Sequence, residues 1–311
     1  MTKDNKPKHP DTRLTTTGRD PEANFGIVNP PVYHASTVTF PTVEALHDAE
    51  KHRFDRVYYG RYGTPTTFAF EEAVADLEGA EHCVAVPSGM AAIAVSLASL
   101  LHGGEHALVT DSAYFPTVKY CNTFLKKFGV EVSYFDPMAS ADEIKALMRP
   151  NTRVVFTEAP GSITFEVQDI PMIADIAHDA GAIVVLDNTW SAGYHFKPFE
   201  HGVDISLQAA TKYIVGHSDA MLGTLTMNDR GLYEHVKITQ VGLGYSTAPD
   251  DCYLGLRGLR TLATRLPRHE STGLKLAEWL AARPEVETVL HPALPSCPGH
   301  DIFKRDFTGS S

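Results

Sequence analysis

Residues 82–101 of the chain read HCVAVPSGMAAIAVSLASLL, which predicts a short buried strand, a turn of small residues and an apolar helix. The turn is Ser88-Gly89-Met90. N–H groups exposed at a helix start, helped by the helix dipole, bind anions, and small residues let a phosphate approach the backbone. An ordinary strand-to-helix turn capped by Ser88 has the same sequence, so this turn alone leaves both interpretations open.

The same alternation of helix and strand continues along the chain from Thr64. Residues 64–79 predict a helix with a proline near its start and a glycine at its end, and further helices are predicted over 116–129 and 171–181. The other predicted strands are HALVT (106–110), VEVSYF (130–135), RVVFTEA (153–159), AIVVLDN (182–188) and DISLQAA (204–210). This order predicts an α/β fold with a mostly parallel sheet covered by helices on both faces.

Ligands of such sheets bind at the carboxyl ends of the strands. We therefore expect the functional residues in the loops that follow the predicted strands. These loops begin after Val86, Thr110, Glu158, Asn188 and Ala210.

The two ends of the chain differ from the part between them. Residues 1–63 are rich in proline and glycine and predict an irregular arm without a core, which must lie over its own domain or over another subunit. Residues 64–258 form the predicted large domain. Residues 259–311 predict a helix bent at Pro267, a short strand over 285–291 and a loop, which we expect to be the start of a second, incomplete domain.

Composition excludes several classes of protein. The chain has 311 residues and a net charge of −11, which disfavours non-specific nucleic-acid binding. No apolar run approaches the roughly 20 residues of a membrane span. The polar start, MTKDNKPKHPDTR, has no apolar core of a secretory signal. The four cysteines form no CxxC pair, so we expect a cytoplasmic enzyme with reduced thiols and no structural metal.

Two strand ends carry candidate chemistry. Asp187 ends the strand AIVVLD, where a carboxylate can bind a metal, act as a base, pair with a protonated heterocycle or accept loop N–H bonds as a structural residue. Thr211 and Lys212 follow the strand ISLQAA. A partly desolvated lysine has a lowered pKa and acts as nucleophile or base, whereas a surface lysine has no such role. Together, a phosphate turn, an acid and an amine on one face are the parts of a pyridoxal phosphate (PLP) site.

Other patterns are weaker. His217 and Asp219 lack a third metal ligand at a useful spacing, so local hydrogen bonding is the favoured interpretation and no metal is expected. VGLGYS (241–246) lacks the third glycine of a dinucleotide fingerprint, and neither a GxSxG elbow nor a phosphate-binding P-loop occurs.

Several motifs resemble those of the PLP-dependent enzymes of cysteine and methionine metabolism. They are YYGRYGTPT (58–66), VPSGMAA (86–92), DSAY (111–114), EAPGS (158–162), DNTW (187–190) and QAATKYIVGHSDAMLGT (208–224). Within this family, PGSITFEVQD (160–169), HPALP (291–295) and KRDFTGSS (304–311) are most similar to the cystathionine β-lyase branch. The resemblance runs from about Thr12 to the last residue.

The resemblance implies a fold, a cofactor and a role for each matching residue. The fold is the type I aminotransferase-like fold, with a seven-stranded sheet and a C-terminal domain of which this chain has only the beginning, assembled as a homotetramer of two dimers. Lys212 would form the Schiff base with PLP, Asp187 would pair with the pyridinium nitrogen, and Tyr114 would stack on the ring. The phosphate would be held by Ser88, Gly89, Met90 and Thr211 of one subunit and by Tyr59 and Arg61 of its neighbour.

The implied activity is a carbon–sulfur β-lyase that cleaves L-cystathionine to homocysteine, pyruvate and ammonia. The chain departs from the family pattern at Ala209, where many relatives have serine, and at Gly161-Ser162, where the γ-synthase and γ-lyase branches carry an ESPxNP loop. The arginine that binds the substrate carboxylate in relatives would lie beyond Ser311. A γ-lyase, a cystathionine γ-synthase, a cysteine desulfhydrase and a non-catalytic fragment therefore remain alternatives.

Overall fold

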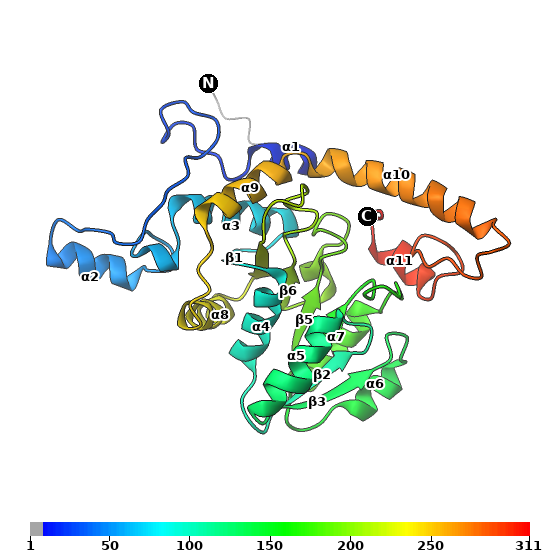
Figure 1. The fold of residues 1–311 in the computed structure, drawn as a ribbon. Coiled ribbons are helices and arrows are strands. Elements are labelled where there is room, and N and C mark those ends of the chain that lie inside the picture. The colour runs from blue at the N-terminus through cyan, green and yellow to red at the C-terminus, as the bar shows by residue number, and fades with distance from the viewer. Residues whose placement is uncertain (1–8) are drawn as a thin grey trace.

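The protein is described by a computed structural model that covers residues 9–311. Its centre is a seven-stranded sheet in the order β1-β7-β6-β5-β4-β2-β3 (Figure 1). The strands are β1 (His82–Val86), β2 (His106–Thr110), β3 (Glu131–Phe135), β4 (Thr152–Glu158), β5 (Ile183–Asp187), β6 (Ile205–Gln208) and β7 (Gly223–Met227). The α/β fold and the mostly parallel sheet are confirmed.

The strand directions bring the ends of β4, β5 and β6 to one edge. The pairs β2–β3, β2–β4, β4–β5 and β5–β6 are parallel, and only β7 pairs antiparallel, with β1 and with β6. In the β4–β5 register Glu158 lies opposite Asp187. Residues that pair in this way place their side chains on the same face, because successive side chains alternate between faces.

Both faces of the sheet are covered because its strands are apolar on both sides. Val84, Phe156 and Leu207 pack in the cluster that includes helix α4 (Gly89–Leu100) and residues of α8 (Arg230–Gly242). Val155 and Leu186, which alternate with them along the strands, pack in the cluster that includes α7 (Ile170–Asp179). The helix α3 (Pro65–Glu78) lies with α9 (Pro249–Leu259) on β1 and β7.

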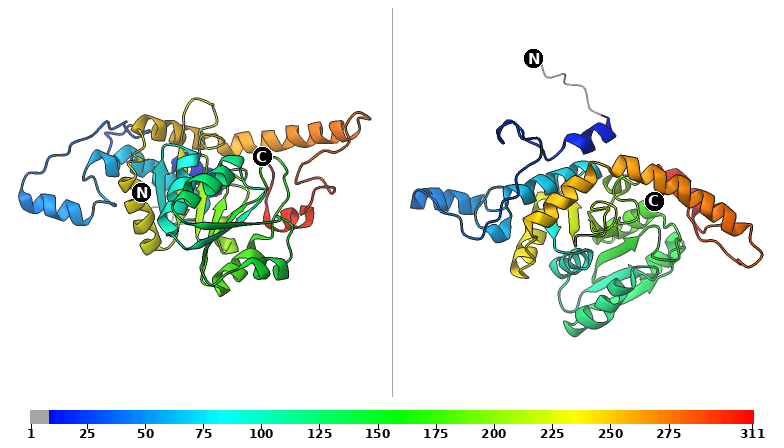
Figure 2. Two further views of the ribbon diagram at one scale, coloured as in Figure 1. Left: turned by 60° about the horizontal axis from the view of Figure 1, so that its bottom comes forward. Right: turned by 45° about the horizontal axis from the view of Figure 1, so that its top comes forward.

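The remaining elements are shorter or lie at the ends of the chain. They are α1 (Pro10–Thr16), α2 (Val43–Lys51), η1 (Gly60–Tyr62), α5 (Phe115–Tyr120), the π-helical turn η2 (Cys121–Leu125), α6 (Ala141–Leu147), η3 (Pro198–His201), α10 (Leu262–Ala281) and α11 (His300–Asp306). In the views of Figure 2, α2 projects from one side of the sheet domain and the far end of α10 from the other.

The chain ends bear out one expectation and correct another. Within the arm over residues 1–63, the described residues include the helices α1 and α2, while residues 26–40, whose sequence GIVNPPVYHASTVTF predicts irregular backbone, form neither helix nor strand. Residues 285–291 form no strand. Their β-branched residues pair with neither edge strand of the sheet, β1 or β3, and a strand exists only through its partner. Pro267 lies inside α10, which continues as one helix.

A buried carboxylate joins the end of α3 to three strands. Glu78 is 1% exposed, and its Oε1 atom accepts hydrogen bonds from Asn188 (2.9 Å), Ser206 (2.9 Å) and Gln208 (2.8 Å). Its Oε2 atom accepts the hydroxyl of Thr226. These donors belong to β6, to β7 and to the residue that follows β5. Four donors replace the water that Glu78 loses, so the carboxylate fixes the strand ends instead of destabilising the core.

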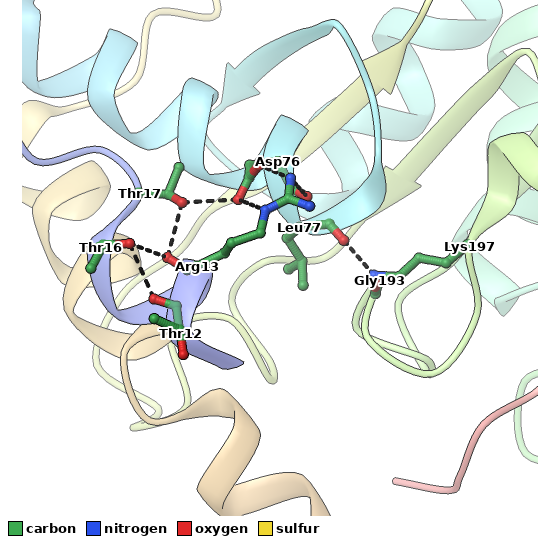
Figure 3. Close-up of polar contacts among 8 residues, drawn as sticks. All are labelled: Thr12, Arg13, Thr16, Thr17, Asp76, Leu77, Gly193 and Lys197. Carbon is green, nitrogen blue, oxygen red and sulfur yellow. Dashed lines mark hydrogen bonds and ion pairs between the residues drawn. The ribbon is translucent and has the colours of Figure 1, made fainter. Parts of the chain in front are cut away.

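The same end of α3 is held from outside by two basic residues. The ammonium group of Lys197 donates to the carbonyl oxygens of Leu77 (2.5 Å) and Gly193 (2.7 Å), as Figure 3 shows. Arg13 of α1 bonds the Asp76 side chain, with Nε at 3.1 Å from Oδ2. Cations at the C-terminal end of a helix also interact favourably with the helix dipole. The segment 188–197, which follows Asp187, is thereby tied to α3.

All four cysteines are free and buried. Burial raises the pKa of each thiol, and that of Cys121 reaches about 12. None of the helices between residues 9 and 311 has the length and apolarity of a membrane span.

The buried ion pair between α3 and α8 gives a test of the packing. Lys237 (1% exposed) donates to Glu71 (6% exposed) at 3.0 Å, and the same Oε1 atom accepts the Ala85 N–H at 2.8 Å. Lys237→Met leaves the Glu71 charge without its counter-ion, so we expect a loss of about 3–5 kcal/mol in the free energy of unfolding, measured with urea. The double variant Glu71→Gln/Lys237→Met, which removes both charges, should recover most of this loss. Equal losses in the two variants would contradict the account.

Candidate active site

Side chains from five strand ends and from the start of α4 line one cavity of about 330 Å³ at the carboxyl edge of the sheet. The cavity includes seven of the nine residues that the sequence predicts for the site: Ser88, Gly89, Met90, Tyr114, Asp187, Thr211 and Lys212. It also includes Ile93, Pro116, Glu158, Thr189, Ala209 and Met221. The structure thus brings the predicted turn, acid and amine together.

The start of α4 is held close to the end of β6. Ser88 is the N-cap, and its Oγ atom accepts the Ala91 N–H at 3.0 Å. A Cβ atom on Gly89 would lie only 2.6 Å from the Cβ atom of Ala209. The glycine therefore lets the helix start approach the strand, and it leaves the free N–H groups of the first helical turn beside the cavity.

The carboxyl group of Asp187 is 6% exposed and held from one side. Its Oδ1 atom accepts hydrogen bonds from the Thr189 N–H (3.1 Å) and from the Thr189 hydroxyl (2.5 Å). The Thr189 hydroxyl in turn accepts the Ala209 N–H at 2.8 Å, which links β5 to β6. Burial raises the pKa of Asp187, whereas these bonds and the charge of Lys212 oppose the rise. The Oδ2 atom accepts no hydrogen bond within residues 9–311.

Lys212 and Tyr114 face one another across the cavity. The Lys212 Nζ atom lies 5.6 Å from the centre of the Tyr114 ring, a cation–π distance. The Tyr114 backbone N–H donates to Glu158 Oε2 at 2.7 Å, which fixes the residue that carries the ring. Burial and the neighbouring Asp187 charge raise the pKa of Glu158 well above its usual value.

Two of the predicted residues, Thr211 and Arg61, have contacts that the sequence does not reveal. The Thr211 hydroxyl lines the cavity but exchanges two hydrogen bonds with Leu222, donating to its carbonyl oxygen (3.0 Å) and accepting its N–H (2.8 Å). Tyr59 and Arg61 do not line the cavity of their own chain. Arg61 instead donates to the Val241 carbonyl oxygen at 2.9 Å.

His217, one of the two weak candidates for a metal ligand, makes a local contact with the backbone. The Nδ1 atom of His217 lies 2.7 Å from the Val215 carbonyl oxygen. Within residues 9–311, no three His, Cys, Asp or Glu side chains gather in a group that would hold a metal ion.

Comparison with known proteins gives the class. The sequence model of the family "Cys/Met metabolism PLP-dependent enzyme" matches residues 11–311. The chain therefore belongs to this family, as its motifs indicate.

Individual relatives refine the comparison. The chain is 50% identical over 300 residues to a putative cystathionine beta-lyase of Rhizobium johnstonii, covering 96% of this chain and 74% of that protein. It is 46% identical over 304 residues to the cystathionine beta-lyase MetC of Escherichia coli, covering 97% and 76%. The crystal structure of MetB from Corynebacterium glutamicum matches with a TM-score of 0.92 at 33% identity, covering 98% of this chain and 77% of that one. The fold is thus the type I PLP fold, and the chain spans about three quarters of these relatives.

The residues of the cavity fit the cofactor of this family. The cavity presents an amine, a carboxylate with one oxygen atom left without a donor, an aromatic face and the N-terminal end of α4. PLP requires an amine, an acid for its ring nitrogen and an anion cradle for its phosphate.

Two lining residues, Glu158 and Thr189, were not predicted as site residues. Glu158 ends β4 directly beside Asp187, and the position of a carboxylate at a strand end was the available signal. Thr189 follows Asp187 by two residues, the spacing at which a side chain or N–H reaches back to an aspartate.

The close approach of Gly89 to Ala209 is testable. In Gly89→Ala the new Cβ atom would lie 2.6 Å from the Ala209 Cβ atom and 2.9 Å from its Cα atom, so α4 must shift away from β6. We expect a loss of about 1–3 kcal/mol in the free energy of unfolding. The variant Gly89→Ala/Ala209→Gly removes the closer contact and should recover part of the loss. A stable single variant would show that the two segments are not packed in this way.

Proposed function

We propose that the protein is a PLP-dependent carbon–sulfur lyase that cleaves L-cystathionine by β-elimination, taking up water and releasing homocysteine, pyruvate and ammonia. The observation that carries the proposal is the convergence of Lys212, Asp187 and the α4 start on one cavity. The identity to cystathionine β-lyases of 46–50% supports the choice of reaction.

In this proposal the bound cofactor would supply an electron sink that accepts the electron pair left when the substrate Cα–H bond breaks. The Lys212 amine would hold the cofactor covalently, be released by the substrate amine, remove the α-proton and return a proton to the leaving sulfur. From its place 5.6 Å from the centre of the Tyr114 ring, the amine would reach a cofactor held against that ring.

Asp187 would keep a proton on the ring nitrogen of the cofactor. Its free oxygen, Oδ2, would accept that N–H bond, while Thr189 holds Oδ1. Tyr114 would orient the ring by stacking, worth about 1 kcal/mol. Ser88, Gly89 and Met90 would hold the phosphate with the N–H groups of the helix start. Thr211 would join them by turning its hydroxyl away from Leu222.

A second subunit would complete the site. Tyr59 and Arg61 lie outside their own cavity, on an arm that carries exposed apolar residues such as Phe25, Ile27 and Val28. This arrangement supports donation of Tyr59 and Arg61 to the phosphate of a neighbouring copy, in a dimer that pairs into a tetramer.

The loop after Glu158 supports the β-lyase branch over the γ-lyase and γ-synthase branches. Gly161 packs against Ser112, with a Cβ atom excluded at 2.8 Å, and Ile163 has a φ of +70°. Ile163 stands where the ESPxNP pattern has its second proline, and proline cannot adopt a positive φ. The loop therefore has a shape that the γ-branch sequence would not adopt.

The first test removes the amine. Lys212→Ala should abolish the visible absorbance of the purified protein with added PLP and lower cystathionine cleavage by at least about a hundredfold, because the covalent link and the base are both lost. The exposed Lys275→Ala on α10 is the control and should keep both properties. Borohydride reduction followed by peptide mapping should place the cofactor on Lys212. A label on another lysine would refute the assignment.

The products of the same assay separate the alternatives. Pyruvate from cystathionine indicates β-cleavage, whereas 2-oxobutyrate indicates a γ-lyase. Release of hydrogen sulfide from cysteine with no cleavage of cystathionine would indicate a desulfhydrase. Absorbance from bound cofactor without any turnover would favour a non-catalytic role.

Sharing of the site between subunits predicts complementation. Arg61→Ala and Lys212→Ala chains, each nearly inactive alone, should regain about a quarter of wild-type activity when co-expressed in equal amounts, since half of the dimers are mixed and each has one intact site of two. Co-expression of Asp187→Ala with Lys212→Ala is the matched control, because both residues belong to one cavity and no intact site forms. Equal outcomes for the two mixtures would exclude donation of Arg61 across the interface.

A further inference from the structure

Two carboxyl groups, not one, face the amine in the cavity. Glu158 and Asp187 are the last residues of the neighbouring strands β4 and β5, and they are paired in register. Paired parallel strands lie about 4.8 Å apart, so the two side chains leave the sheet side by side and on the same face. Both line the cavity with Lys212.

Two carboxyl groups that lie side by side resist being ionised together at neutral pH, because each negative charge disfavours the other. The hydrogen bonds decide which of the two keeps its charge. Asp187 accepts two bonds on Oδ1, from the N–H and the hydroxyl of Thr189. Glu158 accepts one bond, from the Tyr114 N–H on Oε2. Its Oε1 atom has no partner among residues 9–311, which leaves a place for a proton.

The neighbouring charges act on both carboxyl groups. Lys212 lowers the pKa of both carboxyl groups, and Glu78 on α3 raises that of Asp187 slightly. Tyr114 faces Glu158 through a neutral N–H. Gln168, from the loop before α7, donates to the Glu158 backbone carbonyl oxygen (2.6 Å) and not to its carboxyl group. Burial and the Asp187 charge raise the pKa of Glu158 well above its usual value, whereas the rise that burial causes in the pKa of Asp187 is opposed by its two bonds from Thr189.

We propose that Glu158 is a positioning residue whose carboxyl group stays protonated at neutral pH, holds the Tyr114 N–H through Oε2, and leaves Asp187 as the one anion of the pair beside Lys212. This inference rests on the proposed function only in that it assigns Lys212 as the reacting amine.

The proton on Glu158 has a consequence for Lys212. A second anion beside the ammonium group would stabilise its charged form, which would weaken the amine as a nucleophile and base. A carboxyl group in its neutral form fixes the aromatic residue without that effect. Glu158 acts here through Tyr114 and Lys212 and does not itself react.

The test compares two isosteric variants by the pH at which Lys212 reacts. PLP is added to the cofactor-free protein, and the rate at which the visible band appears is followed against pH. Asp187→Asn removes a negative charge that stabilises the ammonium form of Lys212. The midpoint of the acid limb of the curve of rate against pH should therefore fall by about one pH unit, as expected for an opposite charge at close range. Glu158→Gln mimics the protonated carboxyl group and should leave the midpoint within about 0.3 units of wild type. A downward shift as large as that of Asp187→Asn would overturn the proposal.

Infrared spectroscopy gives a readout that does not depend on the cofactor. Protein made with isotope-labelled glutamate should show a protonated carboxyl band at neutral pH that moves with the label and is lost in Glu158→Gln. In Asp187→Asn the same band should disappear at lower pH, because the repelling charge is gone. A band that follows labelled aspartate, or one that persists in Glu158→Gln, would place the proton elsewhere. If no visible band forms with PLP in any variant, the proposed function fails, and the infrared result still decides the protonation of Glu158.

Discussion

The structure depends on one buried carboxylate, that of Glu78. Its four donors come from β6, β7 and the residue after β5, so a single side chain at the end of α3 joins the strands whose ends form the cavity. Two of these donors, Asn188 and Gln208, stand next to Asp187 and Ala209 in the chain. A hydrogen bond to a charged group is worth about 1.5–3 kcal/mol and is directional, so this network sets the position of the strand ends as well as their stability.

Contacts around Glu78 also hold the loop that follows Asp187. Gly193 has a φ of +65°, and a Cβ atom there would lie 2.6 Å from the Glu78 side chain, so the loop after Asp187 closes tightly over the network. Lys197 then ties this loop to the last turn of α3. Such supporting contacts are what holds reacting groups in place within a fraction of an ångström, and here they lie behind Asp187 and away from the cavity.

The sequence was sufficient to predict the features that depend on local patterns. The alternation of apolar runs and helices predicted β1 to β6 and the parallel sheet, and the strand-end rule led to Asp187 and Lys212 because parallel strands bring their carboxyl ends to one edge. The roles of the site residues remain predictions, carried by the motifs of the family.

Features that depend on non-local partners were not predictable in this way. The strand β7 has the short sequence GTLTM and exists by pairing antiparallel with β1 and β6, whereas the β-branched residues 285–291 pair with neither edge strand and form no strand. Glu158 was also not predicted as a site residue. Its place beside Asp187 depends on the register between β4 and β5, which the sequence of one strand does not reveal.

The burial of the four cysteines has a bearing on the chemistry proposed for the site. The reaction would release a thiol, and the disulfide that such a thiol forms on oxidation exchanges with a cysteine that is both accessible and ionised. Cys83, Cys121, Cys252 and Cys297 are each at most 4% exposed, and the pKa of each thiol is raised by burial. Burial would thus protect the thiols of the folded chain from mixed disulfides with the oxidised form of a thiol product.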